Sequence, residues 1–310
     1  MGIVVIGAVF VDIKGFPDEA YIPDGRNVGR IEYIHGGVCR NVAEDIANVE
    51  LRPTFISIVD DSAMGADVLK KLKNHRVDTQ YIQTVPGGMG TWLAIFDNHG
   101  DLAGSISQRA DLMPIMKVLE EYGDEIFSQA DAIVIQADMH KDLIKKSFAL
   151  AEKYQKKTFA VVSNMSIAVE RRDLLQKVDC FVCNQLEAGM LFTDDYSTKE
   201  PAELCEILSE RVILGKIPAM IVTMGSKGAV YADMQGTKGV CPARSVQVKD
   251  TTGAGDAFFA GVTIGLTYGK TLAESAQIGT RLAASVITSS ENVCPRFLPR
   301  ELGLDMDPIE

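Results

Sequence analysis

The sequence predicts an α/β protein in which helices cover both faces of a mostly parallel sheet, and two observations carry this prediction. Short apolar runs, typical of strands buried on both faces, recur at residues 3–7, 54–59, 132–135, 158–162, 180–183 and 219–222. Several of these runs are separated by segments in which apolar residues follow helical spacing. Strands that alternate with helices indicate right-handed crossovers, and the ligands of such sheets collect at the carboxyl ends of the strands.

Helical spacing is clearest in two segments. The first follows Gly36 and Gly37, and the second precedes the run at 219–222; their apolar positions are Val38, Val42, Ile46 and Val49, and Leu204, Ile207, Val212 and Ile213. A chain of 310 residues exceeds the usual domain size, but α/β folds of this length often form one core with an appendage. We therefore expect a single domain, 1–310.

Two segments interrupt the alternation of strands and helices, at residues 13–35 and 81–107. The second contains the strand-like stretches 92–96 and 103–107. Together the two segments predict short strands that pair into a small accessory sheet.

Composition excludes several classes of protein. The net charge is −11, which argues against binding of nucleic-acid polymers or anionic membranes. No apolar run approaches the roughly 20 residues that cross a bilayer, and no charged prefix of a signal peptide is visible, so we expect a cytoplasmic protein. Cys180 and Cys183 have CxxC spacing, but no second pair accompanies them and their surroundings resemble a buried strand.

The stretch from Asp250 to Phe259, DTTGAGDAFF, places small residues directly before a predicted helix and an acid in its first turn. Gly253 and Gly255 permit backbone conformations closed to other residues, so the amides here can converge on an anion at the positive end of the helix. A carboxylate beside an anion is costly, and Asp256 is explained as the base that accepts the proton of an attacking hydroxyl. The alternative is a helix entry with an acid that favours the dipole.

Three other motifs accompany this stretch, and together they resemble the ribokinase-like, or PfkB, family of carbohydrate and nucleoside kinases. They are GGVCRNVA at 36–43, NQLE at 184–187 and TMGSKG at 223–228. The resemblance implies a ribokinase-like three-layer α/β/α fold with a small β-sheet lid, formed here by about 13–35 and 81–107. Residues 11–15, 37–44 and 290–295 are further similar to the pseudouridine kinases within the family.

The resemblance also implies roles for single residues. Asp256 is the catalytic base, and the amides of Gly253, Ala254 and Gly255 stabilise charge on the transferred phosphoryl group. The ribose is held by Asp12, Gly36, Gly37 and Asn41. Asp12 and Asn41 have a plainer interpretation, in which they cap a turn and a helix.

The nucleotide and cations are assigned to the later motifs. Asn184 and Glu187 are expected near the phosphates of ATP, where they hold water-bound Mg²⁺; a capping box competes with this interpretation. Thr223, Gly225 and Gly228 are expected against the nucleotide, although their pattern is also that of a common turn. Asp250 and Thr252, with carbonyls near residues 289–291, are candidates for a monovalent-cation site that holds K⁺.

We therefore predict an ATP-dependent kinase that transfers the γ-phosphoryl group to the 5′-hydroxyl of a ribosyl acceptor, with pseudouridine favoured. Ribokinase or a kinase for another nucleoside is the alternative, and a phosphosugar kinase or a non-catalytic nucleoside-binding regulator is less favoured. Lys14 and Thr91 are candidates for reading the edge of the base. A homodimer through the lid is expected, because the lid carries Trp92, Leu93, Ile95 and Phe96.

Two other nucleotide-binding classes fit poorly. The stretch 265–271 resembles a Walker A loop but is one residue short and follows no strand, so it is better explained as a break between helices. A dinucleotide-dependent dehydrogenase is disfavoured because the chain contains no G-x-G-x-x-G.

Overall fold

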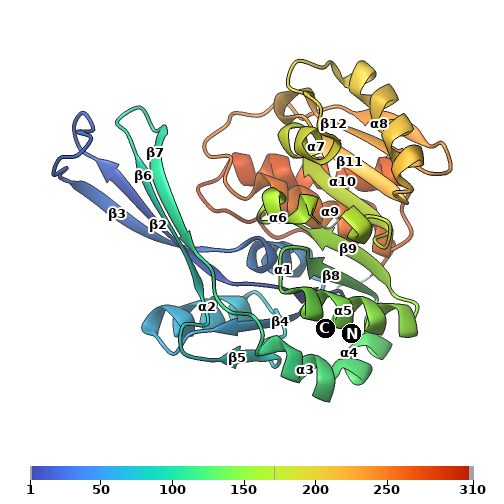
Figure 1. The fold of residues 1–310 in the computed structure, drawn as a ribbon, viewed down its shortest axis with the longest axis horizontal. Coiled ribbons are helices and arrows are strands. Elements are labelled where there is room, and N and C mark those ends of the chain that lie inside the picture. Colours follow the sequence, from blue (N-terminus) through green and yellow to red (C-terminus); the bar gives the residue numbers. More distant parts are fainter. Residues whose placement is uncertain (1, 171, 307–310) are drawn as a thin grey trace.

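Two separate sheets organise the molecule, which we describe from a computed structural model at residues 2–170 and 172–306. Within these residues the larger sheet has nine strands in the order β13-β12-β11-β10-β9-β8-β1-β4-β5, and the smaller has four in the order β3-β2-β6-β7. Helices cover both faces of the larger sheet, and the smaller sheet projects from it as an arm (Figure 1). The predicted three-layer fold with a small separate sheet is confirmed.

All six apolar runs form neighbouring parallel strands of the large sheet, as predicted. They are β1 (Val4–Ile6), β4 (Thr54–Val59), β8 (Ala132–Gln136), β9 (Lys157–Val161), β10 (Cys180–Asn184) and β11 (Ala219–Thr223). The edges are completed by β5 (Ile82–Thr84), which is parallel, and by β12 (Ala229–Asp233) and β13 (Lys238–Cys241), which are antiparallel.

The helices divide between the two faces of this sheet. One layer contains α1 (Val38–Asn48), α2 (Ala63–Asn74), α9 (Ala254–Thr267) and α10 (Leu272–Ile287). The other contains α3 (Ile115–Glu121), α4 (Gly123–Gln129), α5 (Lys141–Lys153), α6 (Met165–Val169), α7 (Gln185–Phe192) and α8 (Pro201–Gly215). The two predicted helices are α1 and α8, but Ile213, expected on the buried face of α8, is exposed.

Side chains of β1 show why the strand is apolar throughout. Val5 packs in the core that includes residues of α1 and α9, whereas Val4 and Ile6 pack in the core formed with α3, α4 and α5. Successive side chains of a strand point to opposite faces, so a strand between two helical layers has no solvent-facing side.

The break between α9 and α10 has the predicted form. Gly269 has a positive φ of 83°, and Thr271 caps α10 in a capping box with Glu274. The stretch 265–271 is therefore a helix end and a helix start. Among the described residues, no helix has the length and apolarity needed to span a bilayer.

The small sheet consists of β2 (Phe10–Pro17), β3 (Gly29–Gly36), β6 (Gly90–Phe96) and β7 (Leu102–Gln108). The two lid segments predicted at 13–35 and 81–107 supply it, with one difference: residues 82–84 form β5, which pairs with β4 in the large sheet. A three-residue strand carries too short a pattern to reveal its sheet.

Register gives the small sheet two different faces. Asp12 pairs with Trp92, and Trp92 with Ser107, so these three side chains lie on one face. Positions between them form the other face, where Tyr33, Leu93, Ile95 and Ile106 are exposed. The apolar surface expected on the lid is therefore built from Leu93 and Ile95 but not from Trp92 and Phe96, which belong to the Asp12 face.

Candidate active site

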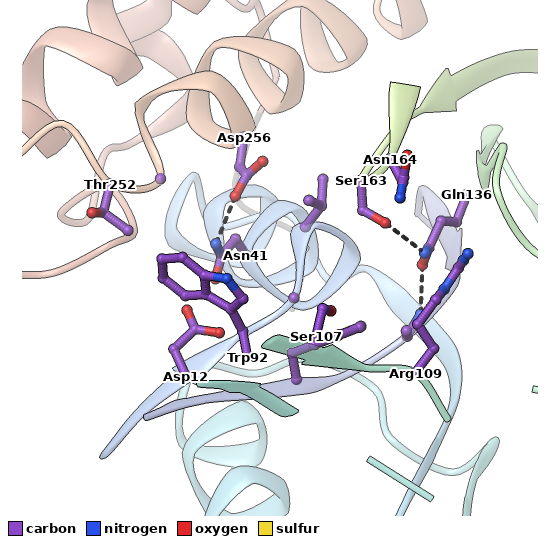
Figure 2. A pocket seen from close by; sticks show the side chains of 15 residues that line it. Asp12, Asn41, Trp92, Ser107, Arg109, Gln136, Ser163, Asn164, Thr252 and Asp256 are labelled. Atoms are coloured by element: carbon purple, nitrogen blue, oxygen red, sulfur yellow. Dashed lines mark hydrogen bonds between the residues drawn. The ribbon is translucent and has the colours of Figure 1, made fainter. Parts of the chain in front are cut away.

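A cavity of about 390 Å³ lies where the small sheet meets the large one. Its walls come from β2, β6 and β7, from the starts of α1 and α9, and from residues at or just after the ends of β1, β8 and β9 (Figure 2). Those three strands are neighbours in the parallel sheet, so the cavity occupies its carboxyl edge, as predicted. Its volume is in the usual range for pockets that take small molecules.

The start of α9 forms one wall. Gly253 is the N-cap, with a φ of 82°, and a Cβ at this position would lie 2.0 Å from the backbone oxygen of Asn292. Glycine is therefore required there by the protein itself. The expectation that Gly255 is equally constrained is wrong: it is helical, and a Cβ there would meet nothing within 4 Å. Its missing side chain leaves open space at the positive end of the helix.

Asp256 lies in the first turn of α9, with Asn41 of α1 beside it. Asn41 Nδ2 donates to Asp256 Oδ2 at 2.6 Å, and Figure 2 shows both side chains at the cavity wall. Burial raises the pKa of Asp256 to about 6, and the nearby charges of Asp12 and Glu187 act in the same direction. A carboxylate held by a neutral amide, with a pKa near neutrality, has the properties of a general base.

Arg40 fixes the amide of Asn41. Its guanidinium is buried, donates to Asn41 Oδ1 and pairs with Glu44 at 2.5 Å. The amide oxygen of Asn41 is also the acceptor for Asn292 Nδ2 at 3.3 Å. With Oδ1 occupied by two donors, Nδ2 must face Asp256, so the orientation of Asn41 follows from its neighbours.

Asp12 extends from β2 toward the same cavity. Burial raises the pKa of its carboxyl group, an effect that the charges of Lys14 and Arg40 oppose. A Cβ on Gly36 would lie 2.5 Å from Asp12 Oδ1, and Gly37 has a φ of 96° with Ala8 O 2.9 Å from its Cβ position. The two glycines therefore give Asp12 room and turn the chain into α1.

Comparison with known proteins identifies the family. The model of the pfkB family of carbohydrate kinases matches residues 2–294. The chain belongs to the pfkB family. The protein is thus a kinase, and its family consists of ATP-dependent enzymes that phosphorylate sugars and nucleosides.

Individual relatives include nucleoside and sugar kinases. Guanosine-inosine kinase of Exiguobacterium acetylicum is 35% identical over 292 residues, which cover 94% of this chain and 95% of that protein. Pseudouridine kinase of Escherichia coli (strain K12) is 26% identical over 275 residues, covering 88% and 86%. The structure of Arabidopsis thaliana ribokinase complexed with ribose and ATP matches with a TM-score of 0.84 at 19% identity, over 98% of this chain and 99% of that one, and shows the shared fold.

The NQLE motif of this pfkB-family chain forms a capping box. Asn184 Oδ1 accepts from the N–H of Glu187 at 2.9 Å, and Glu187 Oε2 accepts from the N–H of Asn184 at 2.8 Å. Both hydrogen bonds of the capping box, the alternative explanation of this motif, are thus present. Burial raises the pKa of the Glu187 carboxyl group. Its second oxygen, Oε1, has no partner among the described residues, and an oxygen donor of this kind fits hydrated Mg²⁺.

The nucleotide-loop residues lie next to this motif. Thr223 at the end of β11 pairs with Asn184 at the end of β10, so the two motifs meet at one edge of the sheet. Gly225 and Gly228 have positive φ values of 56° and 94°, and a Cβ on Gly228 would lie 2.2 Å from Cys241 O. Both glycines are explained by the tight turn into β12, and neither they nor Thr223 line the cavity.

The candidate cation residues are held by a local turn. Asp250 Oδ1 accepts from the N–H of Thr252 at 2.8 Å. Burial acts to raise the pKa of Asp250, but the hydrogen bonds from Thr252 and the charge of Lys14 outweigh it, and the pKa is lowered. Gly253, directly after this turn, approaches Asn292, directly after residues 289–291.

The two residues expected to read the base lie differently. Lys14 shares a face of β2 with Asp12, is buried, and influences Asp12 and Asp250 electrostatically, but it does not line the cavity. Thr91 pairs with Val11 and therefore faces away from the Asp12 side of the sheet, whereas its neighbour Trp92 lines the cavity. Thr91 does not face the cavity because side chains alternate between the two faces of a strand, and its neighbour Trp92 takes the cavity side.

Several cavity residues carry no motif and were missed by sequence reasoning. They are Trp92, Ser107, Arg109, Gln136, Ser163 and Asn164. Gln136 could have been found, because it is the polar residue that ends a buried strand at the carboxyl edge. The others depend on strand register and on loops.

Proposed function

We propose that this pfkB-family kinase transfers the γ-phosphoryl group of ATP to the 5′-hydroxyl of the ribosyl group of a nucleoside. The observation that most supports this proposal is the setting of Asp256. Its carboxyl group is partly buried, has a pKa of about 6, and lies at the open positive end of α9, where it faces a cavity that Asp12 also lines. A base and an anion site side by side suit phosphoryl transfer.

The chemistry uses the chain's own residues as follows. Asp256 accepts the proton of the 5′-hydroxyl while the hydroxyl oxygen forms its bond to the γ-phosphorus, and the bond from that phosphorus to the β,γ-bridging oxygen breaks to release ADP. The amides of Gly253, Ala254 and Gly255 stabilise the charge on the phosphoryl oxygens. Asp12 accepts hydrogen bonds from ribose hydroxyls.

Nucleotide and cations are assigned to neighbouring residues. Asn184, Thr223, Gly225 and Gly228 border the ATP site in this proposal. Glu187 would hold Mg²⁺ through water, and the bound ion would shield the phosphate charges. Asp250 and Thr252 would hold K⁺, a role supported by their oxygen atoms and by the contact of the adjacent Gly253 with Asn292.

Two acceptors are supported by different observations. Pseudouridine is favoured by residues 11–15, 37–44 and 290–295 and by the relative at 26% identity. Guanosine and inosine are favoured by the relative at 35% identity, which covers more of both chains. Both candidates share the ribosyl 5′-hydroxyl and a base that carries carbonyl groups.

A coupled assay of ADP release tests the proposal, with inosine, guanosine, pseudouridine, uridine, adenosine, ribose and fructose 6-phosphate at equal concentrations. We expect turnover with at least one nucleoside and kcat/KM for ribose at least tenfold below it. Turnover confined to free sugars or phosphosugars would refute the nucleoside proposal and leave the family unaffected.

The outer face of the small sheet supports a homodimer. Tyr33, Leu93, Ile95 and Ile106 expose apolar area on this face, which none of the described helices covers. Sedimentation at micromolar concentration tests this: a monomer would refute it, and Leu93→Asp should dissociate a dimer. We place the enzyme in the cytoplasm, where ATP and nucleosides are available; cell fractionation tests that assignment.

A further inference from the structure

The end of the cavity opposite Asp12 is formed by a chain of hydrogen bonds that none of the family motifs includes. Arg109 Nη2 donates to Asp138 twice, to Oδ2 at 2.6 Å and to the backbone oxygen at 2.7 Å. Ser163 Oγ donates to the same Asp138 Oδ2 at 2.7 Å. Gln136 Nε2 donates to Ser163 Oγ at 3.3 Å, and Gln136 Oε1 accepts from the N–H of Ala8 at 2.7 Å.

The direction of these bonds is fixed by chemistry. The N–H of Ala8 can only donate, so the amide oxygen of Gln136 faces Ala8 and the amide nitrogen faces Ser163. Asp138 has no proton to give while ionised, and its side chain is 0% exposed, behind Arg109 and Ser163. Each acceptor in this hydrogen-bond chain, on Asp138, Ser163 and Gln136, therefore already has a donor within the protein.

The groups of Arg109 and Gln136 that remain for a ligand are donors. Arg109 is 38% exposed and lines the cavity, and its Nε and Nη1 have no partner among the described residues. Gln136 also lines the cavity and has a second amide hydrogen, which the bond to Ser163 does not use. Figure 2 shows Arg109 and Gln136 on the side of the cavity away from Asp12 and Asp256.

This wall lies where the base of a nucleoside would be placed. If the 5′-hydroxyl meets Asp256 and the ribose hydroxyls meet Asp12, the base must extend into the rest of the 390 Å³ cavity, toward Arg109. This step rests on the proposed function. With Nη2 bound to Asp138, Arg109 keeps its Nε–H and Nη1–H donors, which lie on different edges of the guanidinium. Either can donate to a carbonyl acceptor such as the O6 atom of a 6-oxopurine.

We infer that Arg109, held by Asp138, selects nucleosides whose base presents carbonyl acceptors and rejects those that present an amino group at the same position. Inosine and adenosine are the sharpest pair, because they have nearly the same shape. Adenine offers an N6 donor where hypoxanthine offers the O6 acceptor, so adenosine would set two donors against each other. A donor of the protein that faces another donor on the wrong ligand loses its hydrogen bond, and this loss separates the two nucleosides.

Asp138 determines how the inference is tested. Removing Arg109 outright would leave a buried carboxylate without its charge partner, and the fold itself could fail. Arg109→Lys keeps the positive charge for Asp138 but replaces the guanidinium, with its free Nε–H and Nη1–H donors, by a single ammonium group. Arg211→Lys is the matched control, because Arg211 also donates from Nη2 to an aspartate, is 39% exposed and lies outside the cavity.

The experiment measures kcat and KM for inosine and adenosine, and calorimetric binding of both without ATP, for the wild type and the two variants. In the wild type we expect kcat/KM for inosine to exceed that for adenosine by about 10²-fold or more. In Arg109→Lys we expect the inosine value to fall about 10- to 100-fold, through KM and Kd, with adenosine changed by less than about threefold. Arg211→Lys should behave as the wild type.

Each result decides something. The inference is overturned if the wild type uses inosine and adenosine equally well. It is also overturned if Arg109→Lys keeps its fold and ATP affinity and leaves the ratio of kcat/KM for inosine to that for adenosine unchanged. In both cases the nucleoside kinase proposal stands. A wild type that phosphorylates no nucleoside overturns both. A fall in kcat with unchanged KM and Kd would contradict recognition of the base by Arg109.

Discussion

The two ends of the cavity use aspartate in opposite ways. At the α9 end, Asp12 and Asp256 make no salt bridge within the described residues, and burial raises the pKa of both. At the β8 end, Asp138 is completely buried and bonded to Arg109 and Ser163.

The difference shows how partners decide what a carboxylate can do. Asn41, a neutral amide, orients Asp256 without neutralising it, so its charge remains available for a proton. Arg109 neutralises Asp138 and is oriented by it, so the carboxylate acts as a support for donors. The Asp256 end of the cavity is thus suited to accept a proton, and the Arg109 end is suited to bind hydrogen-bond acceptors of a ligand.

The largest expected effect comes from replacing Asp256, the proposed catalytic base at the α9 end of the cavity. Asp256→Asn should lower kcat by about 10²–10⁴, because the amide keeps the shape but cannot take the proton. ATP affinity by calorimetry should stay within about threefold. Wild-type turnover at saturating nucleoside would remove Asp256 from the mechanism.

The same variant has a stability signature with a defined sign. A raised carboxyl pKa contributes stability that is present below the ordinary value of 3.8 and is lost as the pH rises through about 6. At pH 8 the ionised Asp256 therefore destabilises the fold, and Asp256→Asn should raise Tm by a few degrees there, on the order of 1 kcal/mol. The gain should vanish near pH 4. A lower Tm at pH 8 would indicate a structural role instead.

A smaller effect separates the two glycines of the α9 start. Gly255→Ala should leave Tm within about 2 °C or raise it, since alanine favours the helix, but should lower kcat about tenfold because its Cβ enters the open space for the phosphoryl group. Gly253→Ala should lower stability by at least about 1–2 kcal/mol, because of the positive φ and the contact with Asn292. Thermal melts and kcat for both variants provide the check, and the reverse pattern would contradict it.

The last prediction concerns pH, which should change the rate through Asp256 at one end of the cavity but not the selection of the nucleobase by Arg109 at the other. The wild-type kcat/KM should fall about tenfold per unit as the pH drops below about 6, because Asp256 must be ionised to act as a base. The ratio of inosine to adenosine should stay level from pH 5.5 to 8, since an arginine does not titrate there. A level rate profile down to pH 5 would contradict the pKa assigned to Asp256.

Much of the fold could be predicted, because six buried parallel strands leave continuous apolar runs in the sequence. The motif residues could be placed too: Asp12, Gly37, Asn41 and Asp256 line one cavity. The face of Trp92 could not be predicted, since it depends on the pairing of Asp12 with Trp92 across two strands. The choice of Thr91 failed for that reason alone.

Long-range pairs explain the other misses. Arg109 and Asp138 are 29 positions apart, in the loops that follow β7 and β8, and neither belongs to a motif. The capping box of Asn184 and Glu187 was foreseen as an alternative because its three-residue spacing is local. Sequence patterns therefore predict local bonds well and pairs between elements poorly.

The hydrogen bond between Asn41 and Asp256 joins residues 215 positions apart, and Asn292 reaches Asn41 across 251 positions. During synthesis α1 leaves the ribosome long before either partner exists. Until residue 292 has been added and folded back, Asn41, the partner of Asp256, lacks its hydrogen bond from Asn292, and Gly253 lacks its contact with Asn292. The proposed phosphoryl-transfer site is thus among the last parts of the fold to be completed, and a chain that stops before residue 292 lacks this arrangement.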